Sequence, residues 1–460
     1  MKGARMRRTM AAVTTGLGLA LLAGCSSTAA NDDSGRDAVD VAEALDGTPA
    51  QATLAVEGLP ATAPAGVPLT VTVTARDAAG SPAQGATIGA TVTRGGGRLA
   101  AATAVTGADG RATFTWTPGP APVLQRLSLA WNDVVAAASL DATLATPVAP
   151  APFGDVNAFL SGNGVSGSTE DLVFTPDGTH LVLGVPGGLI QMDTTGNATT
   201  MALTGDALGW TLGLAYDAEG VLWGADANGK ALRRIDTEGK VTTIAGGTTA
   251  FPLKYPNDIT VGPGGRIILA DSCLGKVLVF NPDGSLVSSA TFDMATEGGA
   301  NGVAVDPAGD ALWVTTENTS LLCTDGSDFA AVNGGLYRFA LAPDGTLGER
   351  TDVAPGLANY ADGVTFDAEG NLYVMVDRLN PDDFTLTESA VLVRPAEGGD
   401  LRRFLVTTDK AMANAAFGPA AFGQQTMYLA LIAMPLVLAP EARGVVRIDV
   451  GIGGLPLIPK

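Results

Sequence analysis

The segment YADGVTFDAEGNLYV, residues 360–374, decides the fold of this chain. An apolar stretch leads into a turn that ends in glycine, and a second apolar stretch follows, which predicts an antiparallel hairpin. Turns of this kind end at five glycines: Gly178, Gly220, Gly265, Gly309 and Gly370. The steps between these glycines are 42, 45, 44 and 61 residues, and most units contain a second such turn. Two hairpins in a repeat of about 40–50 residues are typical of a four-stranded propeller blade.

The repeat predicts an all-β fold in which a six-bladed β-propeller spans residues 154–455. Five units are regular, and a more divergent sixth unit covers about residues 408–450. In residues 49–145, apolar and polar side chains alternate between Gly/Asp turns, as in LTVTVTA at residues 69–75. This pattern predicts an immunoglobulin-like β-sandwich that precedes the propeller. The Pro-rich residues 146–153 predict an extended linker between the two domains.

The N-terminal residues predict export and a lipid anchor. A basic start is followed by an apolar run without charge, as in a secretory signal peptide, and the run ends in LAGC at residues 22–25. This string resembles the lipobox of bacterial lipoproteins, so we expect residues 1–24 to be a lipoprotein signal peptide and Cys25 to be lipidated. Residues 25–48 contain few large apolar side chains and predict a disordered tether. The protein would then be anchored to the bacterial cell membrane on its extracytoplasmic side.

Charge and cysteine content limit the partners. The chain has 47 acidic and 27 basic residues, for a net charge of −20, which argues against nucleic acid as a partner and is compatible with cation binding. We expect a monomer. After Cys25 only Cys273 and Cys323 remain. They can pair in an oxidising compartment, but the sequence does not give their distance, so the disulfide stays open.

One position of the repeat carries a set of oxygen ligands. Counting back eight residues from each turn glycine reaches the start of the innermost strand, at Glu170, Leu212, Asn257, Asn301 and Asp362. Equivalent positions in a propeller face the same end of the central channel, so four of these five side chains would place oxygens around one point. Two carboxylates and two carboxamides predict a calcium site. Zinc is disfavoured, because His180 is the only histidine. The alternative is that these polar residues line a wet channel.

The motifs around these positions resemble those of a known family. They are STEDLVF at residues 168–174, YPND at 255–258, GANGVA at 299–304 and YADGV at 360–364. They look like the metal-ligand motifs of the senescence marker protein/gluconolactonase family, which includes regucalcin, with paraoxonases and diisopropyl fluorophosphatase as more distant relatives. The resemblance covers about residues 154–455. It implies a six-bladed propeller and metal-dependent hydrolysis of lactones or related esters.

By the same resemblance, Glu170, Asn301 and Asp362 would bind the metal, and Asn257 would contact metal or substrate. Members that act on sugar lactones often carry an arginine two residues before the third-unit asparagine. This chain has Tyr255 there, which puts a sugar acid lactone in doubt. The neighbouring Lys254 could supply a cation, although we expect it to be an exposed strand-edge residue.

These observations predict a calcium-dependent hydrolase that takes a small-molecule ester or lactone. Asp362 is the first candidate for general base or nucleophile, because a ligand carboxylate keeps one oxygen beside the substrate. Asp258 and Asp271 are weaker candidates, and Glu317 is expected to be a loop carboxylate. The alternative function is a non-catalytic propeller that calcium stabilises and that serves as a binding or scaffold module at the cell surface.

Overall fold

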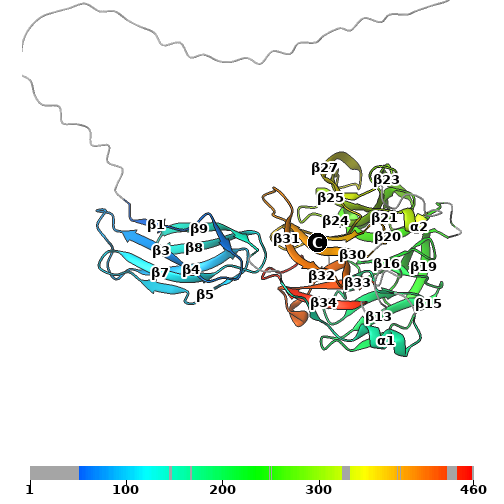
Figure 1. Ribbon diagram of the computed structural model, residues 1–460, viewed down its shortest axis with the longest axis horizontal. Helices are drawn as coiled ribbons and strands as arrows, with labels where there is room; N and C mark the ends of the chain where they lie inside the picture. The colour runs from blue at the N-terminus through cyan, green and yellow to red at the C-terminus, as the bar shows by residue number, and fades with distance from the viewer. Residues whose placement is uncertain are drawn as a thin grey trace, which may run out of the picture. The chain divides into compact units, whose positions relative to one another are not determined.

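This computed structural model describes residues 51–144, 148–165, 168–247, 249, 251–323, 332–380, 382–383, 385–432 and 443–457. The predicted signal peptide, the tether and Cys25 lie outside these residues, as do residues 145–147 at the start of the predicted linker. Strands make up most of the described chain and helices little of it, which confirms the all-β prediction (Figure 1). Within the described ranges, no helix has the length and apolar character needed to cross a membrane.

Residues 53–143 form two sheets. The first contains, in spatial order, β1 (Thr53–Glu57), β3 (Leu69–Arg76), β7 (Arg111–Thr117) and β5 (Arg98–Leu99). The second contains β2 (Thr62–Pro64), β9 (Val134–Thr143), β8 (Leu124–Trp131), β4 (Thr87–Arg94) and β6 (Thr103–Val105). Successive residues of β7 alternate between exposed and buried, and its Phe114 and Trp116 share one apolar cluster with Leu127 and Leu129 of the other sheet. The period of two therefore buries one face of each sheet.

The strands described from residue 151 onward form six units, numbered in chain order; unit 2 has five strands and the others have four, and units 4 and 5 are joined in one eight-stranded sheet. Unit 1 has β11 (Leu172–Phe174), β12 (Leu181–Val185), β13 (Gly188–Met192) and β14 (Ala198–Thr200). Unit 2 has β16 (Thr211–Tyr216), β17 (Leu222–Asp226), β18 (Ala231–Ile235) and β19 (Lys240–Gly246), with the short β15 (Thr204–Gly205) at its edge. Unit 3 has β20 (Pro256–Gly262), β21 (Arg266–Asp271), β22 (Lys276–Phe280) and β23 (Leu286–Thr291).

Units 4 to 6 follow the same order. Unit 4 has β24 (Gly299–Val305), β25 (Ala311–Glu317), β26 (Gly334–Leu341) and β27 (Leu347–Ala358). Unit 5 has β28 (Tyr360–Phe366), β29 (Leu372–Leu379), β30 (Leu386–Arg394) and β31 (Arg402–Thr407). Unit 6 has β32 (Ala411–Phe417), β33 (Thr426–Ile432), β34 (Gly444–Asp449) and β10 (Ala151–Pro152). The short helices are α1 (Val156–Gly162), α2 (Ser320–Cys323), η1 (Pro263–Gly265) and η2 (Ala420–Phe422).

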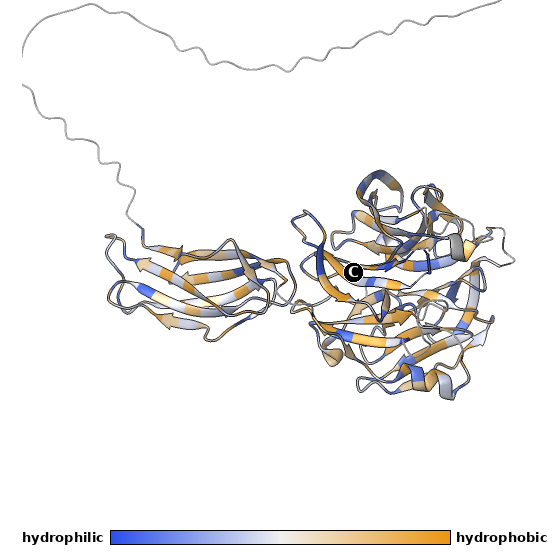
Figure 2. Ribbon diagram, in the orientation of Figure 1, coloured by the Kyte–Doolittle hydropathy of each residue, from blue (hydrophilic) through white to orange (hydrophobic). Residues whose placement is uncertain are grey.

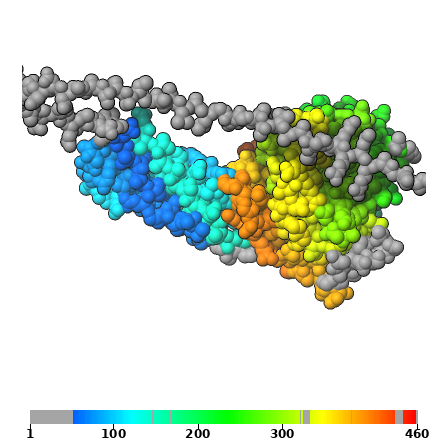
Figure 3. All heavy atoms as spheres, turned by 90° about the horizontal axis from the view of Figure 1, so that it is seen from above, coloured from blue at the N-terminus to red at the C-terminus, as the bar shows by residue number. Residues whose placement is uncertain are grey.

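The first strands of the six units form a closed ring. Each of β11, β16, β20, β24, β28 and β32 contacts the next, and β32 contacts β11. The space-filling view in Figure 3 shows the green, yellow and orange units side by side in chain order. Apolar strands (orange in Figure 2) pack between neighbouring units, as Trp223 of unit 2 does with Ile259 and Leu269 of unit 3. The core is thus distributed between adjacent units.

Unit 6 combines strands from both ends of the ring. Ala151 and Pro152, which we placed in the linker, form β10 and pair with Arg447 and Val446 of β34. Proline is tolerated there because β10 is the edge strand of its unit. Main-chain pairing between the start and the end of the ring therefore holds it closed.

A register shift typical of a β-bulge occurs at the same position in units 2 to 6. The pairing register between the first and second strands shifts between Thr211 and Gly213, Pro256 and Ile259, Ala300 and Val303, Ala361 and Val364, and Met412 and Ala415. In units 3 to 6 each shift leaves two residues without a partner in the ladder. A bulge turns its side chains out of the regular alternation. Because the bulges lie at equivalent positions, the first residues of the pairs form one row around the ring and the second residues form an adjacent row. In unit 1 the equivalent pair, Glu170 and Asp171, directly precedes β11.

Candidate metal centre

The first row holds the predicted ligand residues. It consists of the first residue of each pair, together with Leu212, the single residue in the unit 2 shift: Glu170, Leu212, Asn257, Asn301, Asp362 and Ala413. The four polar members are buried, with Glu170 6% exposed, Asp362 4% and Asn301 1%. The structure therefore places all four predicted side chains at equivalent positions of units 1, 3, 4 and 5.

Glu170 and Asp362 are buried beside other negative charges. Burial is the main reason why the pKa of each lies well above its ordinary value. The Glu170 and Glu317 carboxylates raise the pKa of Asp362 further, and Glu317 does the same for Glu170. In the part of the chain that the structure describes, neither Glu170 nor Asp362 accepts a hydrogen bond through its carboxylate. Both groups would gain from a nearby cation.

Glu317 belongs to this centre, and our expectation that it is a loop carboxylate was wrong. It is the last residue of β25, is 3% exposed, and pairs through its backbone with Tyr360 of β28. Burial raises the pKa of Glu317 to about 7, although hydrogen bonds from Ser272 and Asn257 oppose this rise. The sequence did carry one signal, because Glu317 ends the strand that pairs with the Asn301 strand.

Hydrogen bonds connect Glu317 to unit 3. Asn257 Nδ2 donates to Glu317 Oε1 and to Ser272 Oγ, at 3.1 Å in each case. The Ser272 hydroxyl lies 2.9 Å from both Glu317 Oε1 and the Ala300 carbonyl oxygen, and its one hydrogen can serve either. Ser272, which sequence reasoning missed, is fully buried. It follows the end of β21 as Glu317 ends β25, so the second strands supply polar groups beside the first row.

The donor set fits a calcium ion. Asn301 Oδ1 is buried and has no hydrogen-bond partner among the described residues. The described residues contain no cluster of three His, Cys, Asp or Glu side chains arranged to hold a metal. A ligand set in the first row would combine the carboxylates with the carboxamides of Asn257 and Asn301. Mixed carboxylate and carboxamide oxygens suit calcium, which accepts six to eight hard ligands, better than zinc.

Two tyrosines lie beside the carboxylates. Burial raises the pKa of the Tyr255 and Tyr360 phenols above their ordinary value, and the charges of Glu317 and Asp362 add to both effects. Both phenols therefore stay protonated and can donate a hydrogen bond. Lys254 is exposed, as expected.

Asp271 holds the segment before Asn257. Its carboxylate accepts hydrogen bonds from the backbone N–H groups of Lys254 and Tyr255, at 2.8 and 3.0 Å. Both of its oxygens are engaged by the main chain, so it is a poor candidate for general base. Its contacts instead fix the backbone that leads into the third-unit bulge.

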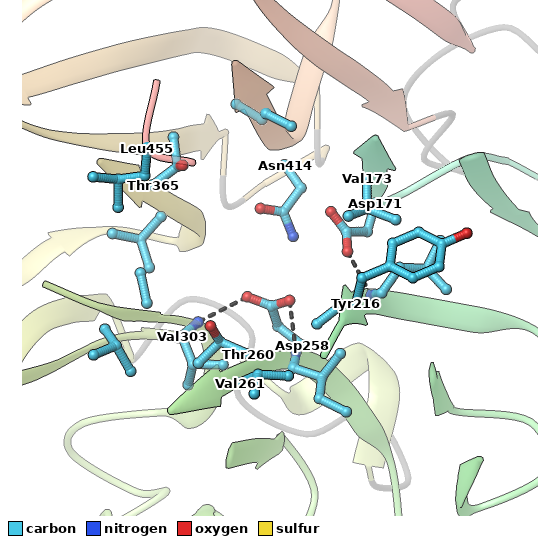
Figure 4. A pocket seen from close by; sticks show the side chains of 18 of the residues that line it. Asp171, Val173, Tyr216, Asp258, Thr260, Val261, Val303, Thr365, Asn414 and Leu455 are labelled. Atoms are coloured by element: carbon cyan, nitrogen blue, oxygen red, sulfur yellow. Dashed lines mark hydrogen bonds between the residues drawn. The ribbon is translucent and has the colours of Figure 1, made fainter. Parts of the chain in front are cut away.

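The second row is equally polar but differently bonded. It contains Asp171, Asp258 and Asn414 among glycines, and Figure 4 shows these three side chains directed into a pocket of roughly 230 Å³. Gly363 in this row has no room for a side chain, since a Cβ there would lie 2.0 Å from Asn414 Oδ1.

Each aspartate of the second row joins two units. Asp171 accepts hydrogen bonds from Leu172 N at 2.7 Å and, across the unit boundary, from Leu214 N at 2.6 Å. Asp258 likewise accepts from Ile259 N at 2.7 Å and from Val303 N of unit 4 at 2.8 Å. Asp258 was a weaker candidate base, and its carboxylate is occupied by these backbone contacts.

Cys273 and Cys323, whose pairing the sequence left open, form a disulfide with a Cα–Cα distance of 5.2 Å. Cys273 directly follows Ser272, and Cys323 lies in α2, shortly after Glu317. The bond thus connects the segments that follow the second strands of units 3 and 4.

Comparison with known proteins gives structural likeness only. No protein-family model matches the chain, and no curated protein sequence does. The solved structures that resemble it include gluconolactonases and regucalcin. A gluconolactonase from Xanthomonas campestris is 21% identical, with 66% of this chain and 95% of that chain covered and a TM-score of 0.45.

Two further solved structures resemble the chain. A calcium-binding regucalcin from Agrobacterium tumefaciens is 18% identical over 67% of this chain and 96% of that chain, with a TM-score of 0.48. A virginiamycin B lyase from Staphylococcus aureus is 11% identical over 79% and 99%, with a TM-score of 0.42. Since all three scores lie below 0.5, none of them carries an argument about the family or activity of this chain.

Proposed function

We propose that this protein is a calcium-dependent hydrolase of lactones or related esters, built on a six-bladed β-propeller of the senescence marker protein/gluconolactonase type. The observation that carries the proposal is the first row: among the described residues, the buried carboxylates of Glu170 and Asp362 have no hydrogen-bond donor, and the buried Asn301 Oδ1 has no partner. Such a row is costly without a cation and well suited to calcium.

The residues of the row have distinct roles in this proposal. Glu170, Asn257, Asn301 and Asp362 would hold the ion, which when bound supplies a positive charge that polarises a carbonyl or phosphoryl oxygen. Asp362 would accept the proton of the attacking water, because its buried carboxylate has no donor among the described residues. The protonated phenol of Tyr255 can donate a hydrogen bond to the substrate.

A panel of substrates tests this function. Aliphatic and aromatic lactones, aryl esters and a phosphotriester are offered to the protein with calcium and with chelator. We expect turnover of at least one class that chelation abolishes and calcium restores. Turnover that is indifferent to chelator would contradict the metal-dependent mechanism.

The second candidate function is a calcium-stabilised scaffold. It is favoured by the position of the four residues on units 1, 3, 4 and 5, because an ion bound there would connect units far apart in the sequence. The same panel separates the two functions: a scaffold binds calcium and melts higher with it, yet hydrolyses none of the substrates.

Localisation forms a further part of the proposal. We propose that the exported protein is anchored through a lipid on Cys25, with residues 49–145 as an immunoglobulin-like spacer. Cys25→Ser should abolish acyl labelling and release the protein from membrane fractions. Unchanged labelling and fractionation would rule out lipidation at this residue.

A further inference from the structure

The carboxamide of Asn257 is oriented by its hydrogen bond to Glu317. Its Nδ2 donates to Glu317 Oε1 at 3.1 Å. A cation bound nearby favours the ionised form of Glu317, and an ionised carboxylate only accepts hydrogen bonds. The amide nitrogen must therefore face Glu317, and the oxygen Oδ1 must face away from it. In the inverted orientation two oxygens would oppose each other in a buried site, without a hydrogen between them.

Glu317 is itself held in place. Its backbone pairs with Tyr360 at the boundary between units 4 and 5, and its Oε1 lies 2.9 Å from the buried hydroxyl of Ser272. The Glu317 carboxylate, which orients Asn257, is therefore held by contacts with two neighbouring units, and Glu317 lies on a strand rather than on a loop.

We propose that Glu317 is the positioning residue of the metal centre, which turns the Asn257 oxygen toward the ion. This inference rests on the proposed function only in that it needs calcium to bind, not in needing hydrolysis. It gives Glu317 a role through Asn257, distinct from that of the ligands themselves. Outer contacts of this kind typically change metal affinity by about 10–100-fold.

A reversal of the hydrogen bond tests the inference. Glu317→Gln leaves Asn257 free to invert, and calcium affinity measured by titration calorimetry should fall about tenfold or more. The double variant Asn257→Asp/Glu317→Gln keeps the same number of charges, but its new glutamine amide donates to the new carboxylate, whose other oxygen faces the ion. We expect the double variant to regain most of the lost affinity.

The gain from Asn257→Asp has to be larger in the Glu317→Gln background than in the wild type, because a carboxylate introduced beside Glu317 would be repelled by it. A parallel cycle of Asn257→Asp with Glu170→Gln measures the coupling that charge alone produces. We expect the coupling with Glu317 to exceed it about tenfold. Glu219→Gln, which removes a surface charge in unit 2, should leave calcium affinity unchanged, and melting in chelator checks that every variant folds.

Each outcome is decisive. Unchanged affinity in Glu317→Gln, or equal coupling in the two cycles, overturns the positioning role. If the wild type binds calcium but hydrolyses none of the substrates, the proposed hydrolase function is wrong, and the two variant cycles still test the positioning role of Glu317. A wild type that binds no calcium overturns both.

Discussion

The two rows of the ring have the same burial and opposite hydrogen bonding. In the second row, each carboxylate of Asp171 and Asp258 accepts two backbone N–H bonds, one of them from the next unit. In the first row, within the described ranges, Glu170 and Asp362 accept none. The fold itself therefore satisfies the second row, whereas the first-row carboxylates lack donors among the described residues and suit the cation that we propose. A buried acid indicates a ligand site only when the protein does not already satisfy it.

A substitution in the first row should reduce hydrolysis while calcium still binds to the folded protein. Asp362→Asn keeps an oxygen for the ion but loses the proton acceptor, so hydrolysis should fall about 10²–10⁴-fold while calcium remains measurable in the protein. Steady-state kinetics and metal analysis check this result. Turnover near the wild-type value would remove Asp362 from the mechanism.

The second row should fail in stability. Asp258→Ala leaves the N–H groups of Ile259 and Val303 without their acceptor, and the free energy of unfolding should fall by about 2–5 kcal/mol. The loss should be the same with calcium and with chelator. Denaturant unfolding of this variant beside Glu219→Gln measures it, and a loss seen only with calcium would assign Asp258 to the metal centre instead.

Calcium itself should stabilise the ring. An ion that binds only the folded chain adds RT ln(1 + [L]/Kd), about 2.7 kcal/mol at a hundredfold excess over Kd. Chelation should therefore lower the melting temperature by several degrees, and Glu170→Gln should shrink that difference because it removes one ligand charge. A wild-type melt that ignores chelator, with no calcium in the purified protein, would eliminate the metal centre.

The smallest effect is a change of sign. In chelator, the first-row carboxylates only repel one another. The free energy of unfolding of Asp362→Asn should therefore exceed that of the wild type by on the order of 1 kcal/mol, and its melting temperature should be slightly higher. With calcium the same variant should melt below the wild type. Calorimetry under both conditions tests the crossing, and a variant that is less stable in both would show that Asp362 has a partner within the fold.

The local sequence pattern predicted the first-row residues, but it did not predict the neighbouring residues that long-range strand pairing brings to the site. The offset of eight residues from each turn glycine identified Glu170, Asn257, Asn301 and Asp362, because a repeated hairpin puts equivalent residues at equivalent places. Glu317 and Ser272 were missed because the second strands reach the site through the pairing register, which no spacing in the sequence specifies. The pairing of β10 with β34 was missed for the same reason, since its partners are nearly 300 residues apart.

The sequence by itself determined the strands, the turns and the repeat, since these depend on the alternation of apolar residues and on glycine at turns. It also determined which residue types stand at the ring position, and so the kind of ion they suit. Only the tertiary structure decided which buried acids are already satisfied. Asp171 and Asp258 meet backbone donors of the neighbouring unit, while Glu170 and Asp362 meet no donor among the described residues. That distinction depends on which residues of different units come within hydrogen-bond distance, and this is fixed only when the ring closes.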